Sequence, residues 1–276
     1  MQVVFVLSSW ASGSSAVAGF LGKCGCYTCP PHFSLLDPRT PNSFESTEYR
    51  DALMACIDEN SLERISPTSN FVAFLSDWLP AQIQKAEEQG YHYLVLKHPL
   101  QSFLLDEITK IVKPIFVVVT RPLEKIEQTR RRRDWGPVYG SAGAKSIYSA
   151  IYSYLHNNSK CYLAVPYEEF RNDVDMQRHL IDYCSIKTTD TQIHSASTWL
   201  RHHTPPVEDS ELRYELEMTE TLNQVMARAK QLEEQAFQAE TRASLAEAQI
   251  AALKNSNSWR ITAPVRAIVA FLRGDF

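Results

Sequence analysis

The chain has 276 residues, of which 44% are hydrophobic and 22% charged, so it can bury a sizeable core and is not a disordered polymer. Its formal net charge is −4 and its pI is about 6.1, which argues against a nucleic-acid partner held by bulk charge. No segment approaches the roughly 20 continuous apolar residues that span a bilayer, and residues 1–7 lack the positive start of a signal peptide. We therefore expect a cytoplasmic protein.

The six cysteines fit free thiols better than a disulfide framework in a chain of this length. Cys24, Cys26 and Cys29 lie close together, but their spacing matches no standard zinc pattern. A fourth ligand, such as His32, would have to come from further along the chain. Partly buried thiols are the simpler interpretation, and we expect no metal.

Short apolar runs without strict alternation predict parallel strands that are covered on both faces, at 3–7, 93–96, 115–119 and 162–165. Helical patterns accompany them at 14–21, 49–57, 71–89, 101–111, 123–133, 144–156 and 174–184. Strands that alternate with helices predict βαβ units, hence an α/β fold with a three-layer parallel sheet over residues 1–206. Ligands of such sheets bind outside the carboxyl ends of the strands.

The composition changes after this region. Residues 207–255 are rich in Ala, Glu, Gln and Leu and contain no glycine or proline. Apolar and small residues recur there at steps of three and four: Leu222, Met226, Ala229, Leu232, Ala236, Ala239, Ala243, Ala246, Ile250 and Leu253. This heptad-like seam predicts a long helix or coiled coil that joins copies of the chain into a homo-oligomer. The alternatives are a single solvated helix and a helix that lies back on the first domain.

The sequence of residues 256–276 predicts a short amphipathic tail. A helix here would carry Arg266 and Arg273 on one face, and on another face the apolar residues Val265, Ile268, Val269 and Leu272. Such a tail could lie on a membrane surface. It could equally dock on a partner protein through 259–276, and the sequence leaves both options open.

The turn after the first strand is small and rich in hydroxyls: Ala11, Ser12, Gly13, Ser14 and Ser15. Its N–H groups, its serine hydroxyls and the dipole of the following helix could together bind an anion. It is not a Walker motif, because the spacing differs and no Gly-Lys-Ser/Thr follows. A serine-rich helix cap is the alternative.

An arginine follows a later strand. Arg121 comes directly after the run at 115–119, where a guanidinium can make a forked contact with phosphate. Thr129, in the next helical stretch, could add a hydroxyl to the same anion. Arg130 begins a run of arginines, of which one or two would reach the site.

The two segments, in this order, resemble those of PAPS-dependent sulfotransferases, particularly the divergent bacterial and carbohydrate-type members (PAPS is 3′-phosphoadenosine 5′-phosphosulfate). In that family the first turn usually reads Arg-Ser-Gly-Thr-Ser and grips the 5′-phosphosulfate. The resemblance gives this role to the loop residues Ser12, Gly13, Ser14, Ser15 and Ala16.

The same resemblance implies that Arg121 and Thr129, with Arg130 beside them, bind the 3′-phosphate of PAPS. Residues 41–46, 94–99 and 164–170 match further family segments in the expected order, so the resemblance covers roughly residues 1–200. It implies a sheet of the P-loop/sulfotransferase type with PAPS as co-substrate.

Ala11 departs from the family pattern, which has a basic residue there to neutralise charge on the bridging oxygen. Lys97, at the end of the strand at 93–96, or an arginine after Thr129 takes over this role; otherwise the protein has lost catalysis.

His98 is the first candidate for the general base, because a histidine at a strand end can take a proton at neutral pH. Glu45 is the second candidate, on the resemblance. A hydrogen-bonded turn histidine and a surface carboxylate are the structural alternatives. Trp10 could stack on an adenine or a sugar, or it is a core or rim aromatic.

We therefore expect a sulfotransferase that moves a sulfuryl group from PAPS to a hydroxyl of a carbohydrate or glycan. The tail at 256–266 resembles segments of enzymes that act on bacterial surface polysaccharides, which favours a carbohydrate acceptor. The alternative is a catalytically degenerate relative that serves as a binding or scaffold protein in surface polysaccharide assembly. A P-loop kinase is disfavoured, because neither a Walker lysine nor an evident magnesium-binding aspartate is present.

Overall fold

The computed structural model describes residues 1–34, 42–203, 231, 247 and 262–273. The chain divides into two compact units, Met1–Pro206 and Val207–Phe276, and each is described by itself. The long helix or coiled coil predicted at 207–255 falls outside the described residues, apart from Gln231 and Glu247.

The first unit is built on a sheet of five parallel strands in the order β2-β3-β1-β4-β5. The strands are β1 (Gln2–Leu7), β2 (Cys26–Tyr27), β3 (Tyr93–Lys97), β4 (Ile115–Thr120) and β5 (Tyr162–Pro166). In the central register Val4 lies between Val95 of β3 and Ile115 of β4. The predicted α/β class with a parallel sheet is confirmed.

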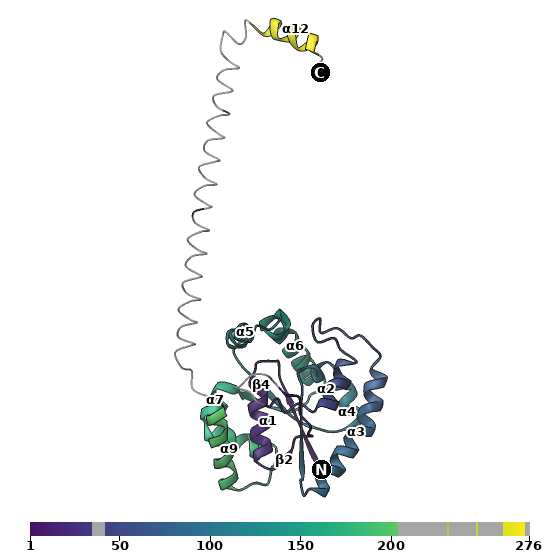
Figure 1. Ribbon diagram of the computed structural model, residues 1–276, viewed down its shortest axis with the longest axis vertical. Helices are drawn as coiled ribbons and strands as arrows, with labels where there is room; N and C mark the ends of the chain where they lie inside the picture. The colour runs from purple at the N-terminus through teal and green to yellow at the C-terminus, as the bar shows by residue number, and fades with distance from the viewer. Residues whose placement is uncertain (35–41, 204–230, 232–246, 248–261, 274–276) are drawn as a thin grey trace. The chain divides into compact units, whose positions relative to one another are not determined.

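Helices cover both faces of the sheet (Figure 1). One face carries α1 (Ser14–Lys23), α7 (Tyr167–Asn172), α8 (Val174–Tyr183) and α9 (Asp190–His203). The other face carries α2 (Thr47–Met54), α3 (Thr68–Glu88), the 3-10 turn η1 (Pro99–Phe103), α4 (Leu105–Ile111) and α6 (Ser141–Asn157). Helix α5 (Leu123–Arg132) and the 3-10 turn η2 (Pro137–Tyr139) pack on α6.

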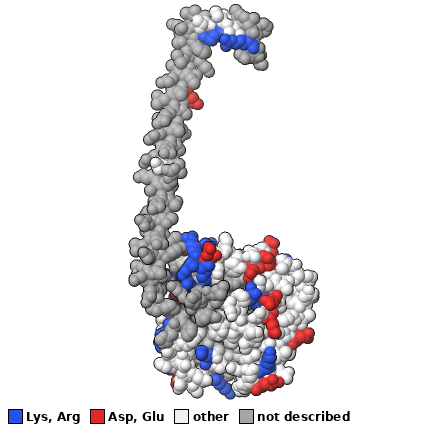
Figure 2. Space-filling model, in the orientation of Figure 1, with Lys and Arg blue, Asp and Glu red and all other residues white. Residues whose placement is uncertain are grey.

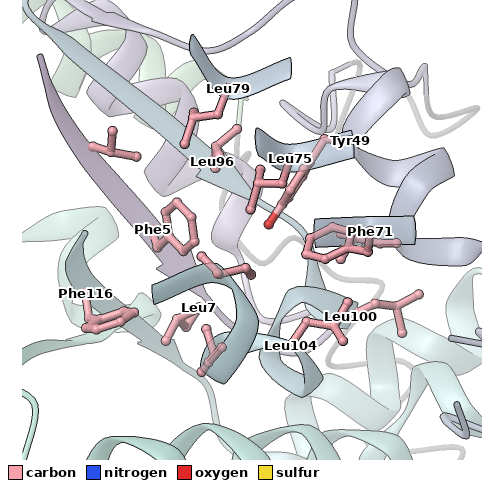
Figure 3. Close-up of a cluster of buried hydrophobic side chains, with 14 of the residues drawn as sticks. Phe5, Leu7, Tyr49, Phe71, Leu75, Leu79, Leu96, Leu100, Leu104 and Phe116 are labelled. Carbon is pink, nitrogen blue, oxygen red and sulfur yellow. The ribbon is translucent and has the colours of Figure 1, made fainter. Parts of the chain in front are cut away.

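The side chains of β1 alternate between the two layers, and both layers are buried. Phe5 and Leu7 pack with residues of α2, α3 and η1, as Figure 3 shows, whereas Val4 and Val6 pack beneath α1. Fully burying an apolar side chain of this size contributes about 1.5–3 kcal/mol. Burial on both faces explains why the strand reads as an unbroken apolar run.

The structure corrects some boundaries. The helix predicted at 101–111 is interrupted at Leu104, whose φ of −125° and ψ of 20° separate η1 from α4. The sequence prediction also missed β2, α7 and α9. Helix α9 packs closely on α1, because a Cβ on Gly19 would lie 2.3 Å from the ring of Trp199.

The strand order defines the edge of the sheet at which such folds usually bind ligands. From β1 the chain crosses to β2 on one side of the sheet, and from β4 it continues to β5 on the other side. The carboxyl ends of β1 and β4 therefore flank a topological switch point, where ligands of open α/β sheets bind.

The second unit contains α12 (Ala263–Arg273), on which Val265 is 62% and Val269 41% exposed. Among the described helices, none combines the length and the hydrophobicity that a membrane crossing requires. The contact predicted for 259–276, with a membrane or a partner protein, stays a prediction.

Candidate active site

The loop between β1 and α1 bends back on itself with two residues in the left-handed region, Ala11 (φ 57°) and Gly13 (φ 87°). Position 13 requires glycine for a second reason, because a Cβ there would lie 2.2 Å from the ring of Tyr167. Gly13 is also the N-cap of α1, and among the described residues no side chain caps this helix end. The first-turn N–H groups of α1, with the helix dipole, therefore suit an anion.

The serines of the loop have different partners. The buried hydroxyl of Ser12 donates to the carbonyl of Ser9 at 2.7 Å, so it stabilises the turn. The Ser15 hydroxyl accepts a hydrogen bond from Lys97, and Ser14 begins α1 in a buried position. The N–H of Ala16 donates to the Gly13 carbonyl at 3.0 Å, so within the described residues it already has a partner.

Lys97, the last residue of β3, is only 4% exposed and reaches the same loop. Its Nζ donates to Ser15 Oγ at 3.0 Å, to the Ser43 carbonyl at 3.1 Å and to Glu45 Oε1 at 2.6 Å. Glu45 precedes α2 and is itself buried. An ammonium group at this depth needs partners, and this set provides three oxygens.

The charge state of Glu45 is set by Lys97. Burial alone would raise the pKa of the Glu45 carboxyl, but the charge of Lys97, with a smaller contribution from His98, and the hydrogen bond from Lys97 lower it below the ordinary value of 4.5. Glu45 is therefore a carboxylate at neutral pH. It lies between a cation and an imidazole at the end of β3.

His98 is held as a neutral imidazole. Burial lowers its pKa from 6.5 to about 4, against the opposing charge of Glu45. Its Nδ1 accepts the N–H of Leu100 at 3.2 Å, which caps η1, so the proton resides on Nε2. Nε2 faces Glu45 Oε2 at 3.9 Å.

Arg121 lies on the other side of the loop, directly after β4. Its Nη1 donates to Thr129 Oγ1 at 2.9 Å and to the Ala11 carbonyl at 3.2 Å, and its Nε donates to Glu168 Oε1 at 2.7 Å. The guanidinium also lies 5.3 Å from the ring centre of Tyr167. Arg121 thereby connects the loop between β1 and α1 to α5 and α7.

Arg130 has partners outside this group. Its guanidinium bonds Glu127, at 2.7 Å from Nη2, and the Trp135 carbonyl, at 2.7 Å from Nη1. The hydrogen bond from Arg130 is the main reason why the pKa of Glu127 is lowered to about 2. Basic side chains gather over α5 on the face seen in Figure 2. The Arg130 side chain, in the last turn of α5, is 20% exposed.

The three clustered cysteines are ordinary buried core residues. Cys24, Cys26 and Cys29 are free and buried, and burial raises the pKa of Cys24 to about 12. Within the described part of the chain, no group of three or more His, Cys, Asp or Glu side chains is arranged to hold a metal ion.

The structure thus brings most of the predicted residues to one edge of the sheet: Ser12, Gly13, Ser14, Ser15, Ala16, Glu45, Lys97, His98, Arg121 and Thr129. The sequence analysis did not identify two contacts of Arg121, the hydrogen bond to Glu168 and the ring of Tyr167 beneath its guanidinium. The resemblance includes the segment 164–170, but no residue pattern in it indicates a contact with Arg121.

No protein-family model matches the chain, and no curated protein matches it either. Among solved structures, the sulfotransferase domain from the Synechococcus PCC 7002 olefin synthase is similar at 18% sequence identity and a TM-score of 0.48. The alignment covers 77% of this chain and 82% of that chain. A likeness of this degree assigns no activity.

Proposed function

We propose that the chain is a sulfotransferase that binds PAPS at the carboxyl ends of β1, β3 and β4 and moves its sulfuryl group to a hydroxyl. The observation that carries the proposal is the 3.0 Å contact between Lys97 Nζ and Ser15 Oγ. The resemblance expects a cation at position 11, where this chain has Ala11. Lys97 supplies that cation to the same loop from β3.

The residues of the loop fit a phosphosulfate group. Helix α1 offers the N–H groups of its uncapped first turn, and Lys97 offers an ammonium, all of which bond phosphate and sulfate oxygens. Arg121 and Thr129, on the β4 side, would hold the 3′-phosphate. Glu168 is 40% exposed at its side chain, so it can turn into water when phosphate takes its place on Arg121.

When bound, PAPS supplies a sulfuryl group whose sulfur bonds the acceptor oxygen while its bond to the phosphate oxygen breaks, leaving the electron pair on the bisphosphate. Lys97 stabilises the negative charge that builds on that phosphate oxygen, and the N-terminus of α1 adds its dipole. As Lys97 turns to this charge, its hold on Glu45 weakens. The carboxylate then becomes more basic at the moment when it accepts the proton of the acceptor hydroxyl.

We assign the general base to Glu45 in preference to His98. The imidazole of His98 already accepts the Leu100 N–H on Nδ1 and carries its proton on Nε2, so it has no free lone pair for an acceptor proton. Glu45 is ionised, buried and next to Lys97. His98 lies on the other side of Glu45, with its Nε2 3.9 Å from Glu45 Oε2.

The acceptor in this proposal is a carbohydrate hydroxyl, supported by the resemblance of the tail. The alternative, a degenerate relative that binds without turnover, would keep the nucleotide site. It does not explain why a lysine and a glutamate are buried together at the strand ends, where an ion pair is costly.

For residues 207–255 we keep the proposal of self-association, which rests on the seam in the sequence. Its role would be to bring several copies of the first unit to one glycan.

The proposal is tested by incubating the full chain with PAPS and a pool of oligosaccharides, and following the formation of adenosine 3′,5′-bisphosphate and sulfated product by mass spectrometry. We expect both products, and neither with Lys97→Met. Nucleotide binding without product formation from any acceptor would favour the degenerate alternative.

A further inference from the structure

A row of aromatic rings runs outward from His98. Trp10, in the loop after β1, has its ring centre 6.5 Å from that of His98 and 4.9 Å from that of Tyr139 in η2. Tyr139 in turn lies 5.6 Å from Trp135, and the guanidinium of Arg133 stands 4.5 Å from the Trp135 ring centre. All these ring pairs meet edge to face.

These rings do not serve the hydrophobic core. Trp10, Tyr139 and Trp135 are each only partly buried, and Trp10 alone packs against the rim of a core cluster. Tyr139 and Trp135 belong to neither of the two buried clusters that flank the sheet. Partly exposed aromatic side chains in contact with one another suit a ligand with apolar surface.

Charged side chains accompany the rings. The pKa of Tyr139 is raised to about 12 by burial and then by Glu59, which accepts the Tyr139 hydroxyl. Arg50 forms ion pairs with two carboxylates. Its Nη2 lies 3.9 Å from Glu59 Oε2, and its Nη1 lies 3.3 Å from Asp51 Oδ1. This combination suits a sugar. The C–H faces of a sugar stack on aromatic rings, and its hydroxyls donate to carboxylates and accept from guanidinium groups.

We infer that Trp10, Tyr139 and Trp135 form the acceptor subsite and that it takes an uncharged hexose of a glycan. This inference rests on the proposed function. The row starts at His98, beside the carboxylate of Glu45, so a sugar on these rings would place a hydroxyl near the base.

The adenine of the nucleotide is a less suitable occupant. The residues suited to the 3′-phosphate, Arg121 and Thr129, lie on the β4 side of the loop. Trp10 instead contacts His98, which follows β3. Beside Tyr139 the guanidinium of Arg50 faces two carboxylates, Asp51 and Glu59, so this end of the row has no excess of cations to select an acidic sugar.

The test is a glycan array that carries neutral and acidic oligosaccharides, probed with the full chain loaded with adenosine 3′,5′-bisphosphate. The variants are Tyr139→Ala and Trp135→Ala, and the matched control is Tyr152→Ala, which removes a 37% exposed ring from α6. We expect the chain to bind neutral hexose-containing glycans, and each test variant to weaken that binding about tenfold or more. Affinity for the bisphosphate, measured separately, should stay within about twofold in all variants, which also shows that they fold.

Other outcomes separate the two claims. Variants that weaken the bisphosphate and leave glycan binding unchanged would assign the rings to adenine. A wild-type chain that binds the bisphosphate but only acidic glycans, or none, would overturn the acceptor inference while the proposed function stands. Absence of bisphosphate binding in the wild type would instead overturn the proposed function.

Discussion

Lys97 and Glu45 form a buried ion pair, with Nζ 2.6 Å from Oε1, although they lie 52 residues apart in the chain. Lys97 ends β3 and Glu45 precedes α2, so the pair ties the segment before α2 to the carboxyl edge of the sheet. Buried ion pairs rarely repay their desolvation, and a pair that persists at a strand end is a candidate for chemistry.

Removing one partner of this pair should destabilise the fold more than removing both. Lys97→Met leaves the Glu45 carboxylate buried without its cation, which typically costs about 3–5 kcal/mol. The double variant Lys97→Met with Glu45→Gln should recover much of that free energy of unfolding. Urea unfolding of the single and double variants measures the coupling, and additive effects would show that the two side chains do not stabilise each other.

The assignment of the base predicts unequal effects on turnover. Glu45→Gln should lower kcat by about 10²–10⁴, the usual contribution of a general base. His98→Asn keeps an acceptor for the Leu100 N–H and should lower kcat by less than about tenfold. The kcat values of the two variants are compared in steady-state assays with PAPS and a glycan acceptor. A larger loss of kcat in His98→Asn than in Glu45→Gln would show that His98 is the general base.

Most of the fold follows from local patterns, because β1, β3 and β4 are apolar runs that are buried on both sides. The edge strand β5 was also predicted from its apolar run, although Tyr162 and Ala164 are exposed there. The strand β2 was missed because it spans just Cys26 and Tyr27 and forms only through pairing with β3. Helix α9 was missed because its sequence is largely polar, and its place is decided by packing on α1.

The residues of the candidate site could be named from the sequence, but most of their contacts could not. Arg121 and Thr129 are eight residues apart, so a strand end followed by a helix brings them together. The contacts of Lys97 with Ser15 and Glu45 bridge 82 and 52 residues and depend on the parallel register. The tautomer of His98 depends on the backbone of η1, which no residue pattern reveals.

The buried imidazole predicts a pH dependence of stability. The pKa of His98 is about 4 in the folded protein, against 6.5 ordinarily, so between these values the unfolded chain binds a proton that the folded chain does not. Stability should therefore fall as pH drops from about 6.5 to 4, by about 3 kcal/mol from this group. The lowered pKa of Glu45 adds a further loss as pH falls below its ordinary 4.5.

Urea unfolding at several pH values measures this slope, and His98→Asn is the control. The variant should lose the slope that His98 contributes between pH 6.5 and 4 and keep the loss that Glu45 adds below pH 4.5. An equal slope in both proteins would mean that His98 is not buried as a neutral ring.

The seam at 207–255 predicts assembly. Deleting residues 207–276, which begin at the boundary of the first unit, should lower the mass measured by light scattering to that of a single first unit. A full chain that is already monomeric would exclude self-association through this segment.

Arg121 should contribute to nucleotide affinity. Arg121→Ala removes the donors beside Thr129 and should weaken binding of adenosine 3′,5′-bisphosphate by about 1–3 kcal/mol, the range for a charged hydrogen bond. Arg178→Ala, which removes an exposed arginine paired with Asp190 on the surface, is the matched control and should leave the affinity unchanged. Equal affinity in Arg121→Ala and the control would place the 3′-phosphate elsewhere.

The most direct test of the nucleotide site is a calorimetric titration of the full chain with adenosine 3′,5′-bisphosphate, with ATP as the comparison. A site formed by the β1 loop, Lys97 and Arg121 predicts a dissociation constant on the order of micromolar for the bisphosphate and much weaker binding of ATP. Binding of neither nucleotide, by a chain that is folded by circular dichroism, would contradict the proposed function.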